Sequence, residues 1–473
     1  MKMSDSKQAE SPSLVVILAA GLGTRLYAEQ KLPKPLTKIL GLTLAERSIA
    51  TFKQDLGISR FVVVVGHEAA RVRQHFEKVA AKWQVSISFV ESMDWKRGNG
   101  ASALAAQAAT GKQPFYLVMV DHLFDPEIVR QLAAKPLTED TIRLAVDHDK
   151  SAIFDLDDVT CVRLDGDRIV QLGKRLPEWN AADTGIFLCS AGLFEGLERA
   201  AKKGHHGLSD GITELASDKR AHVVDVTGCW WLDVDTLKAL KAAETELLRR
   251  TASKSNDGPI ARHLNRPISR FMTRYLINTP ITPNQISVGS WLLSCVAAVL
   301  LALGGYPALV AGGVMAQFAS IVDGCDGEIA RLKRQQSEFG GWFDAVLDRY
   351  ADAFLLFALT WHGVQQDGKI SVLLIGFAAI LGSFMTSYTA DKYDSLMASF
   401  AANSPFRIGR DLRVFIIFLG AIFNLPVVAL TIIAVIMNLE VVRRIVLAAR
   451  ANQVYGDQKH HPPQNSLDLG NST

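Results

Sequence analysis

The sequence predicts a multidomain chain with an N-terminal α/β domain and a C-terminal all-α polytopic membrane domain of about six transmembrane helices. Residues 1–257 mix charged and apolar positions as water-soluble domains do, whereas residues 285–450 carry repeated apolar runs broken by short polar stretches. The length of 473 residues is enough for two domains with a sizeable core each. We expect the N-terminal domain at 13–250, a linker and amphipathic juxtamembrane segment at 251–284, the membrane domain at 285–450 and a disordered polar tail at 451–473.

The overall composition excludes several classes of protein. The formal net charge of +3 is close to neutral, so no nucleic-acid partner is expected. The five cysteines include no CxxC pair, which favours reduced thiols over a disulfide framework or a zinc site. The first apolar run, Leu14 to Ala20, is too short for a secretory signal, so we expect the N-terminal domain to stay in the cytoplasm.

Between Leu14 and Arg250, short β-branched apolar runs alternate with helical patterns. This alternation predicts strands separated by helices and therefore a parallel α/β sheet. The predicted strands are Leu14–Leu18, Phe61–Val65, Val85–Val90, Phe115–Val120 and Ile142–Val146.

A glycine-containing turn follows the first predicted strand. It contains Gly21 and Gly23, then Arg25, and a Pro-Lys-Pro-Leu segment places Lys34 shortly after. Glycines after a strand let backbone N–H groups approach phosphates, and Arg25 and Lys34 would neutralise a triphosphate. The turn lacks the GxGxxG pattern, which disfavours a dinucleotide site.

The combination of AAGxGTRL and PKPL resembles the sugar-phosphate nucleotidyltransferases with a MobA-like, Rossmann-like fold, over most of residues 14–240. The resemblance implies catalytic roles for Lys34 and Arg25, and magnesium ligation by Asp121 with Asp233 or its competitor Asp235. It implies a nucleotide site made by Leu18, Ala19, Ala20, Gly21, Gly23, Thr24, Arg25, Lys34, Gly98, Asn99 and Asp121. The pocket for the substrate phosphate and alcohol would comprise Lys174, Glu178, Asn180 and Gly185.

The second half of the chain has the pattern of a membrane protein. Residues 259–279 interleave arginines with apolar residues, which indicates an amphipathic segment at a membrane surface or, alternatively, a surface helix of the soluble domain. Basic residues lie in alternate connections, so the positive-inside rule places both termini in the cytoplasm of a cell-membrane protein. The six apolar runs are Ile286–Leu303, Pro307–Ile321, Trp342–Trp361, Val372–Tyr388, Val414–Phe423 and Val427–Met437, the fifth being short for a span.

Four aspartates at helical spacing mark the expected chemical centre of the membrane domain. Asp323 and Asp326 are three residues apart and Asp344 and Asp348 are four apart, so each pair shares one helix face. A charged Asp inside a span costs about 2.5–3.5 kcal/mol, which argues against unpaired structural carboxylates. Bound divalent cations would remove that cost, and oxygen ligands suit Mg²⁺ or Mn²⁺.

This stretch is similar to the signature of the CDP-alcohol phosphotransferases, D-x2-D-G-x2-A-R-x8-G-x3-D-x3-D, at every fixed position. The resemblance implies that Asp323, Asp326 and Asp344 hold two metal ions and that Asp348 is the general base and also a metal ligand. Residues binding the CDP-alcohol would be Gly327, Ala330, Arg331 and Gly340. Arg407, Arg410 and Arg413 would either clamp the phosphate of an acceptor or act as positive-inside anchors, and the sequence leaves both interpretations open.

The fusion of the two halves indicates that the first makes the CDP-alcohol that the second consumes, with CTP as the nucleotide. The whole arrangement resembles the bifunctional inositol-phosphate cytidylyltransferase/di-inositol-phosphate phosphate synthase family. This implies CTP and inositol phosphate as substrates, CDP-inositol as intermediate, a second inositol phosphate as acceptor, and a homodimer in the bilayer. The alternatives are transfer of another CDP-polyol to a lipid acceptor and, from a different class, a six-span transporter with a regulatory domain, which leaves the aspartate spacing unexplained.

Overall fold

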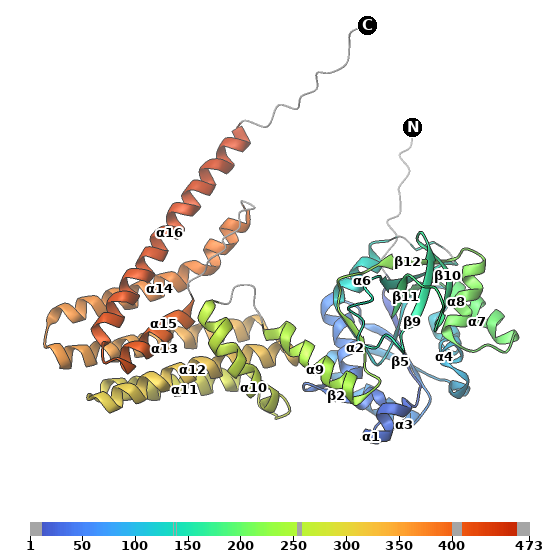
Figure 1. Cartoon of the computed structure of the whole chain (residues 1–473), viewed down its shortest axis with the longest axis horizontal. Helices are drawn as coiled ribbons and strands as arrows, with labels where there is room; N and C mark the ends of the chain where they lie inside the picture. The colour runs from blue at the N-terminus through green and yellow to red at the C-terminus, as the bar shows by residue number, and fades with distance from the viewer. Residues whose placement is uncertain (1–11, 136, 139, 253–257, 400–408, 461–473) are drawn as a thin grey trace, which may run out of the picture. The chain divides into compact units, whose positions relative to one another are not determined.

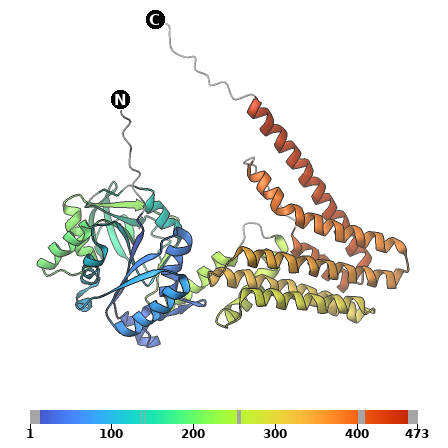
Figure 2. The same cartoon turned by 180° about the vertical axis from the view of Figure 1, so that it is seen from behind.

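The computed structural model describes residues 12–135, 137–138, 140–252, 258–399 and 409–460. The chain divides into two compact units, Met1–Leu247 and Leu248–Thr473 (Figures 1 and 2).

A nine-stranded sheet forms the centre of the first unit, and all five predicted strands belong to it. β1 pairs in parallel with β4 and β6, but β11 runs antiparallel to both β6 and β8. The five predicted strands run in one direction, as expected, but the sheet as a whole is mixed, because β11, which was not predicted, returns along its neighbours without a parallel crossover. In spatial order the strands are β5 (Ser86–Glu91), β4 (Arg60–Val65), β1 (Leu14–Ala19), β6 (Phe115–Met119), β11 (Ala181–Cys189), β8 (Ile142–Asp147), β12 (Ala221–Asp225), β10 (Arg168–Lys174) and β9 (Thr160–Asp165).

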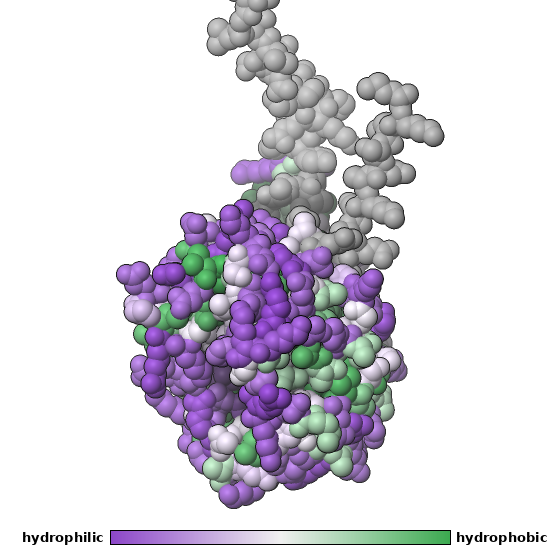
Figure 3. Space-filling model, turned by 90° about the vertical axis from the view of Figure 1, so that its right-hand side faces the viewer, coloured by the Kyte–Doolittle hydropathy of each residue, from purple (hydrophilic) through white to green (hydrophobic). Residues whose placement is uncertain are grey.

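Helices cover both faces of this sheet (Figure 1). Successive side chains of a strand point to opposite faces, so Val16 packs into one apolar cluster and Val15 into the other. The first cluster includes residues of α4 (Asn99–Ala105), α7 (Gly192–Lys202) and α8 (Leu208–Ser217). The second includes residues of α2 (Leu44–Ala50), α3 (Ala69–Trp83) and α6 (Pro126–Ala133). The outer face shown in Figure 3 is mostly hydrophilic, as expected where a three-layer domain meets water.

Short elements connect the layers of the first unit. A two-stranded pairing of β7 with β13 stands apart from the main sheet and becomes important for the site. The remaining elements are α1 (Thr24–Gln30), β2 (Lys38–Ile39), β3 (Leu42–Thr43), α5 (Gln107–Thr110), β7 (His122–Phe124), β13 (Trp231–Asp233) and α9 (Leu237–Ala252).

The second unit is helical throughout the part that the structure describes. Its first long helix begins at a capping box, in which Thr282 and Gln285 satisfy each other's backbone N–H groups and Pro283 occupies the first turn. The helices are α10 (Arg266–Leu276), α11 (Pro283–Ala302), α12 (Tyr306–Leu332), α13 (Glu338–Asp367), α14 (Ile370–Ser399), α15 (Arg410–Ile422) and α16 (Pro426–His460).

Four of these helices are long and apolar enough to cross a membrane, namely α11, α12, α14 and α16. The expected count of six spans is therefore not confirmed. Helix α15 has 13 residues, fewer than the about 20 that a bilayer requires. Helix α13 has 30 residues and is long enough to span a bilayer. Its composition, and not its length, separates it from the four, because Asp344, Asp348 and Asp352 lie in its first half.

The expected amphipathic segment at 259–279 contains α10, whose Ser269 and Thr273 are buried while Phe271 and Tyr275 are about two-thirds exposed, at 63% and 66%. Beyond residue 450, where a disordered tail was expected, α16 continues as far as His460. Residues 461–473 lie outside the described part of the chain.

Candidate active sites

The glycine turn after β1 brings Lys34 into the first site. Gly23 has φ +61°, a left-handed conformation that favours glycine, and a Cβ built there would lie 2.6 Å from the Cγ of Lys34. The lysine side chain therefore passes directly over a residue that has no side chain. Lys34 is buried, and its ammonium group donates to Asp121 Oδ2 at 2.5 Å and pairs with Asp235.

A compact group of potential metal ligands lies beside Lys34. One donor atom each from Asp121, His122 and Asp233 lie within 4.8 Å of one another. The antiparallel pairing of β7 with β13 sets Asp233 directly opposite His122, while Asp121 follows the end of β6. Asp235, the expected competitor of Asp233, instead pairs with Lys34 and Arg25. His122 was not predicted, and its only sequence signal was its place next to Asp121.

The charges of this cluster shift its titration strongly. Burial alone would lower the pKa of Lys34, but Asp121, Asp233 and Asp235 outweigh burial and raise the pKa above its ordinary value. Burial and the neighbouring charge of Asp121 raise the pKa of Asp233 to about 7. Burial would also lower the pKa of His122, but Asp233 and Asp121 outweigh it and raise this pKa to about 9. The carboxylates of the cluster therefore keep Lys34 and His122 in their charged forms.

These groups line a cavity of about 380 Å³. Of the predicted nucleotide residues, Thr24 and Arg25 are not among its lining residues, but Arg25 donates to Asp158, which is one of them, at 2.6 Å. The predicted residues that do line it are Leu18, Ala19, Ala20, Gly21, Gly23, Lys34, Gly98, Asn99 and Asp121.

Two of the four residues predicted for the alcohol-phosphate pocket line the same cavity, namely Lys174 and Gly185. Glu178 and Asn180 do not. The Asn180 side-chain oxygen instead accepts from the backbone N–H of Leu164 at 2.9 Å, so this side chain stabilises strand β9. Lys174 pairs with Asp158, whose importance the sequence did not indicate.

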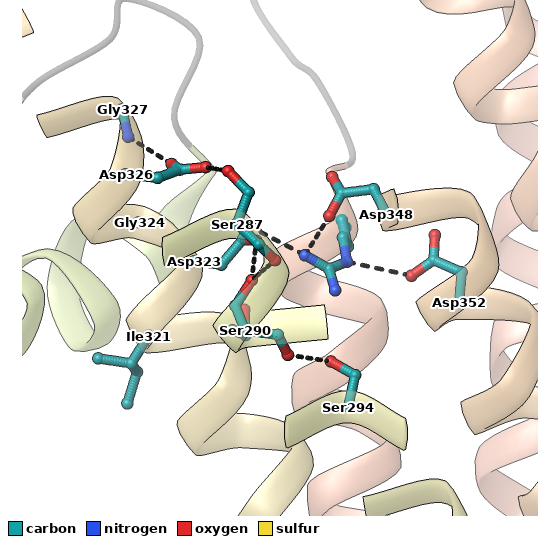
Figure 4. Close-up of polar contacts among 12 residues, drawn as sticks. Ser287, Ser290, Ser294, Ile321, Asp323, Gly324, Asp326, Gly327, Asp348 and Asp352 are labelled. Atoms are coloured by element: carbon teal, nitrogen blue, oxygen red, sulfur yellow. Dashed lines mark hydrogen bonds and ion pairs between the residues drawn. The ribbon is translucent and has the colours of Figure 1, made fainter. Parts of the chain in front are cut away.

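The second site lies between helices of the second unit. Asp323 and Asp326 of α12 and Asp344 of α13 each offer a carboxylate oxygen, and these oxygens lie within 4.8 Å of one another. Serines of α11, which the sequence did not single out, contact the α12 acids (Figure 4). Ser287 Oγ donates to Asp326 Oδ2 at 2.5 Å, and Ser290 Oγ lies 3.0 Å from Asp323 Oδ1.

Two arginines reach the acids from α15. Arg410 Nη1 lies 2.5 Å from Asp348 Oδ1 and 3.0 Å from Asp323 Oδ2, so its side chain belongs to the acid cluster. Arg410 and Arg413 also share Asp352, at 3.2 and 2.7 Å. Asp352 was missed, although it continues the four-residue spacing of the two acids before it on α13. Arg407 lies outside the described residues.

The residues predicted to bind the CDP-alcohol flank the same acids. The backbone N–H of Gly327 donates to Asp326 (Figure 4), and a Cβ at Gly340 would lie 3.0 Å from Ser337 Oγ. Ala330 and Arg331 follow on α12, and Arg331 Nε donates to the Thr251 carbonyl at 2.7 Å.

The donor sets of both clusters fit divalent cations. In the first cluster, Asp233 Oδ1 is buried without a hydrogen-bond partner, which is costly unless a cation occupies the position beside it. In the second, three carboxylates converge among apolar helices, and a bound cation would reduce their mutual repulsion.

Comparisons with known proteins divide the chain in the same order. Residues 15–219 match the family model of the MobA-like NTP transferase domain, and residues 280–453 match that of CDP-alcohol phosphatidyltransferase. A Rubrobacter xylanophilus protein named bifunctional IPC transferase and DIPP synthase is 37% identical over 92% of this chain and 96% of its own length. A protein of the same name from Thermococcus kodakarensis is 32% identical over 81% of this chain and 83% of its own.

The second half alone also has relatives. A Pyrococcus horikoshii protein named archaetidylinositol phosphate synthase is 27% identical over 38% of this chain and 90% of its own length. The likeness to the first two relatives, by contrast, extends across both units. The chain therefore belongs to the family of bifunctional IPC transferase and DIPP synthases.

Proposed function

We propose that this chain transfers CMP from CTP to inositol phosphate, giving CDP-inositol and pyrophosphate. It then transfers the inositol-phosphate group of CDP-inositol to a second inositol phosphate and releases CMP. The proposal rests on one observation. The chain holds two separate acid clusters in the two kinds of domain that these steps require, and each cluster lies beside a basic side chain with little exposure, Lys34 in the first and Arg410 in the second.

In the first step, a phosphate oxygen of inositol phosphate attacks the α-phosphorus of CTP, and the bond to pyrophosphate breaks. Lys34 and Arg25 would neutralise the triphosphate and the leaving group, since both already pair with carboxylates at the cavity. Lys174 would hold the phosphate of the incoming alcohol from the cavity wall. Positioning and charge neutralisation account for this chemistry without a covalent intermediate.

In the second step, Asp348 takes the proton of the acceptor hydroxyl, whose oxygen attacks the β-phosphorus of CDP-inositol while the bond to CMP breaks. Arg410 supports the clamp interpretation of the arginines, because it contacts Asp348 and Asp323 inside the cluster and is too buried to act as a surface anchor. A phosphate bound at Arg410 would bring the rest of the acceptor next to the base. Gly327 and Gly340, which lack side chains, would admit the nucleotide.

Magnesium is the cation we assign to both sites, with Mn²⁺ as a substitute. Asp121 and Asp233 would hold it in the first site, with the His122 ring beside them at 2.9 Å from Asp121, and Asp323, Asp326 and Asp344 would hold it in the second. When bound, the cations supply charge stabilisation for the leaving phosphates. We further propose that the chain is a homodimer in the cell membrane, with both termini in the cytoplasm as the positive-inside rule requires; light scattering of the detergent-solubilised protein and labelling of added terminal cysteines test these two points.

The test uses purified full-length protein with CTP, Mg²⁺ and inositol phosphate, and ³¹P NMR to identify the products. We expect pyrophosphate, CMP and a phosphodiester that retains a terminal phosphate. Asp348→Asn should still form pyrophosphate but no CMP, whereas Asp121→Asn should release CMP only when CDP-inositol is supplied. The absence of both pyrophosphate and CMP from the unaltered protein would refute the proposal. A transporter or scaffold would retain its function in Asp348→Asn.

A second candidate is transfer of the CDP-alcohol to a lipid. It is favoured by the likeness of the membrane domain to a relative named archaetidylinositol phosphate synthase. In this case pyrophosphate would form without CMP in detergent, and CMP would appear only after lipids were added. Radiolabelled inositol recovered in a lipid extract would identify this function.

A further inference from the structure

Glu328 is a buried acid in the signature segment for which the proposed chemistry has no use. It lies two residues after Asp326 on α12, and only 1% of its surface is exposed. A charged carboxylate inside a span is costly unless hydrogen-bond donors surround it. A residue that imposes such a cost, so close to two metal-ligating acids, needs a compensating role.

All the donors that the structure gives Glu328 come from α10. Ser269 Oγ and Thr273 Oγ1 each donate to its carboxylate at 2.7 Å, and Arg266 Nη1 donates at 3.2 Å. Residues 266, 269 and 273 follow helical spacing, so they form one face of α10, and that face is buried. We call this arrangement the Glu328 clamp. A buried ion pair of this kind is weak evidence for stability, and its better-attested role is to fix the position of one helix along another.

The clamp holds the same turn of α12 that carries the metal-ligating acids. On the side facing α10, Arg266 Nη1 also donates to the Gly324 carbonyl at 3.3 Å, and Cys325 Sγ lies 3.5 Å from the Ser269 carbonyl. A Cβ at Gly324 would lie 3.3 Å from Arg266 Nη1, so glycine leaves room for this contact. On the side facing α11, serines contact Asp323 and Asp326 (Figure 4). The turn of α12 that carries Asp323 and Asp326 is thus contacted by α10 on one side and by α11 on the other.

We propose that Glu328 is a positioning residue for the transferase step, and that through it the amphipathic helix α10 keeps Asp323 and Asp326 in their metal-binding geometry. This inference rests on the proposed function of the membrane domain. Glu328 touches neither substrate nor metal; it acts through the backbone of α12. Loss of the clamp should therefore lower the turnover of the second step and weaken its affinity for Mg²⁺ while leaving the first step unchanged.

The experiment compares Glu328→Gln and the milder Thr273→Val with unaltered full-length protein, using supplied CDP-inositol and inositol phosphate. Asp367→Asn is the matched control, because Asp367 is an exposed acid at the far end of a helix of the same unit. For Glu328→Gln we expect kcat for CMP release to fall about tenfold or more and the half-activating Mg²⁺ concentration to rise by a similar factor, as for other partners of metal ligands.

A second readout does not depend on activity. Cys325 is buried against α10, so release of the clamp should make its thiol react faster with a maleimide, measured by peptide mass spectrometry. Pyrophosphate formation from CTP serves as an internal control for the first unit.

Unchanged CMP release together with unchanged Cys325 labelling in Glu328→Gln would overturn the inference. So would a parallel loss of CMP release and folded protein in both variants with unaltered Mg²⁺ dependence, since that outcome marks a purely structural role. If the unaltered protein releases no CMP, the proposed function fails, and Cys325 labelling still decides whether Glu328 holds α10 in place.

Discussion

Replacing Ser287 by alanine tests how the membrane site holds its metal-ligating acids. The hydroxyl of Ser287 donates to Asp326 at 2.5 Å from the neighbouring helix α11 (Figure 4). A hydrogen bond to a charged group contributes about 1.5–3 kcal/mol. If that energy orients Asp326 for metal binding, its loss corresponds to an increase of about 10- to 150-fold in the half-activating Mg²⁺ concentration, at about 1.4 kcal/mol per factor of ten.

The measurement is CMP release from supplied CDP-inositol as a function of Mg²⁺ concentration. Ser294→Ala is the matched control, because Ser294 lies on the same face of α11 but donates to the Ser290 carbonyl at 3.0 Å and contacts no acid. Pyrophosphate release from CTP should be unaffected in both variants. If Ser287→Ala and Ser294→Ala have the same Mg²⁺ dependence, the reasoning that α11 orients the acids is wrong.

Three further predictions concern the first unit. Lys34→Met should lower pyrophosphate release by about 10²- to 10³-fold, because it removes the cation beside the transferred phosphates, while CMP release from supplied CDP-inositol persists. Asp158→Asn should lower KM for inositol phosphate a few-fold in steady-state assays, since Asp158 competes for Lys174 and Arg25; an unchanged or higher KM would contradict this. The Asp233 carboxyl, with a pKa of about 7, must lose its proton to bind a metal, so the Mg²⁺ concentration needed for pyrophosphate release should rise by up to about tenfold per pH unit as pH falls below 7 and level off above it. The sign follows because protonation neutralises this ligand at low pH, and a flat Mg²⁺ dependence between pH 5.5 and 8 would refute it.

Local spacing accounts for what the sequence predicted well. The five strands of the first unit appear because short β-branched runs between turn residues have few alternatives to burial in a sheet. Asp323, Asp326 and Asp344 meet because helical periodicity fixes a common face on α12 and another on α13, and both helices pack against α11. The glycine turn places Lys34 at the cavity for a similarly local reason.

Two other expectations were incomplete or are not confirmed, because the physical decision was not local. The sequence suggested a parallel sheet, yet β11 inserts antiparallel between β6 and β8, and strand direction depends on the path of the connecting chain. Six apolar runs suggested six spans, but only four helices are long and apolar enough among the described residues. The acids of α13 make it less apolar than hydropathy runs alone indicated.

By itself, the sequence determined the two domain types, the glycine turn of the first domain, the aspartate signature of the second and most of the acids of both sites. These are properties of residue spacing along one strand or one helix. Only the tertiary structure decided which groups neutralise and orient those acids. The pairing of β7 with β13 brings His122 rather than Asp235 into the first cluster, and the packing of α15 brings Arg410 to Asp348. Likewise, Ser269 and Thr273 of α10 donate hydrogen bonds to Glu328, which lies more than fifty residues later in the chain. Charge compensation is a matter of distance in space, which the order of residues along the chain does not specify.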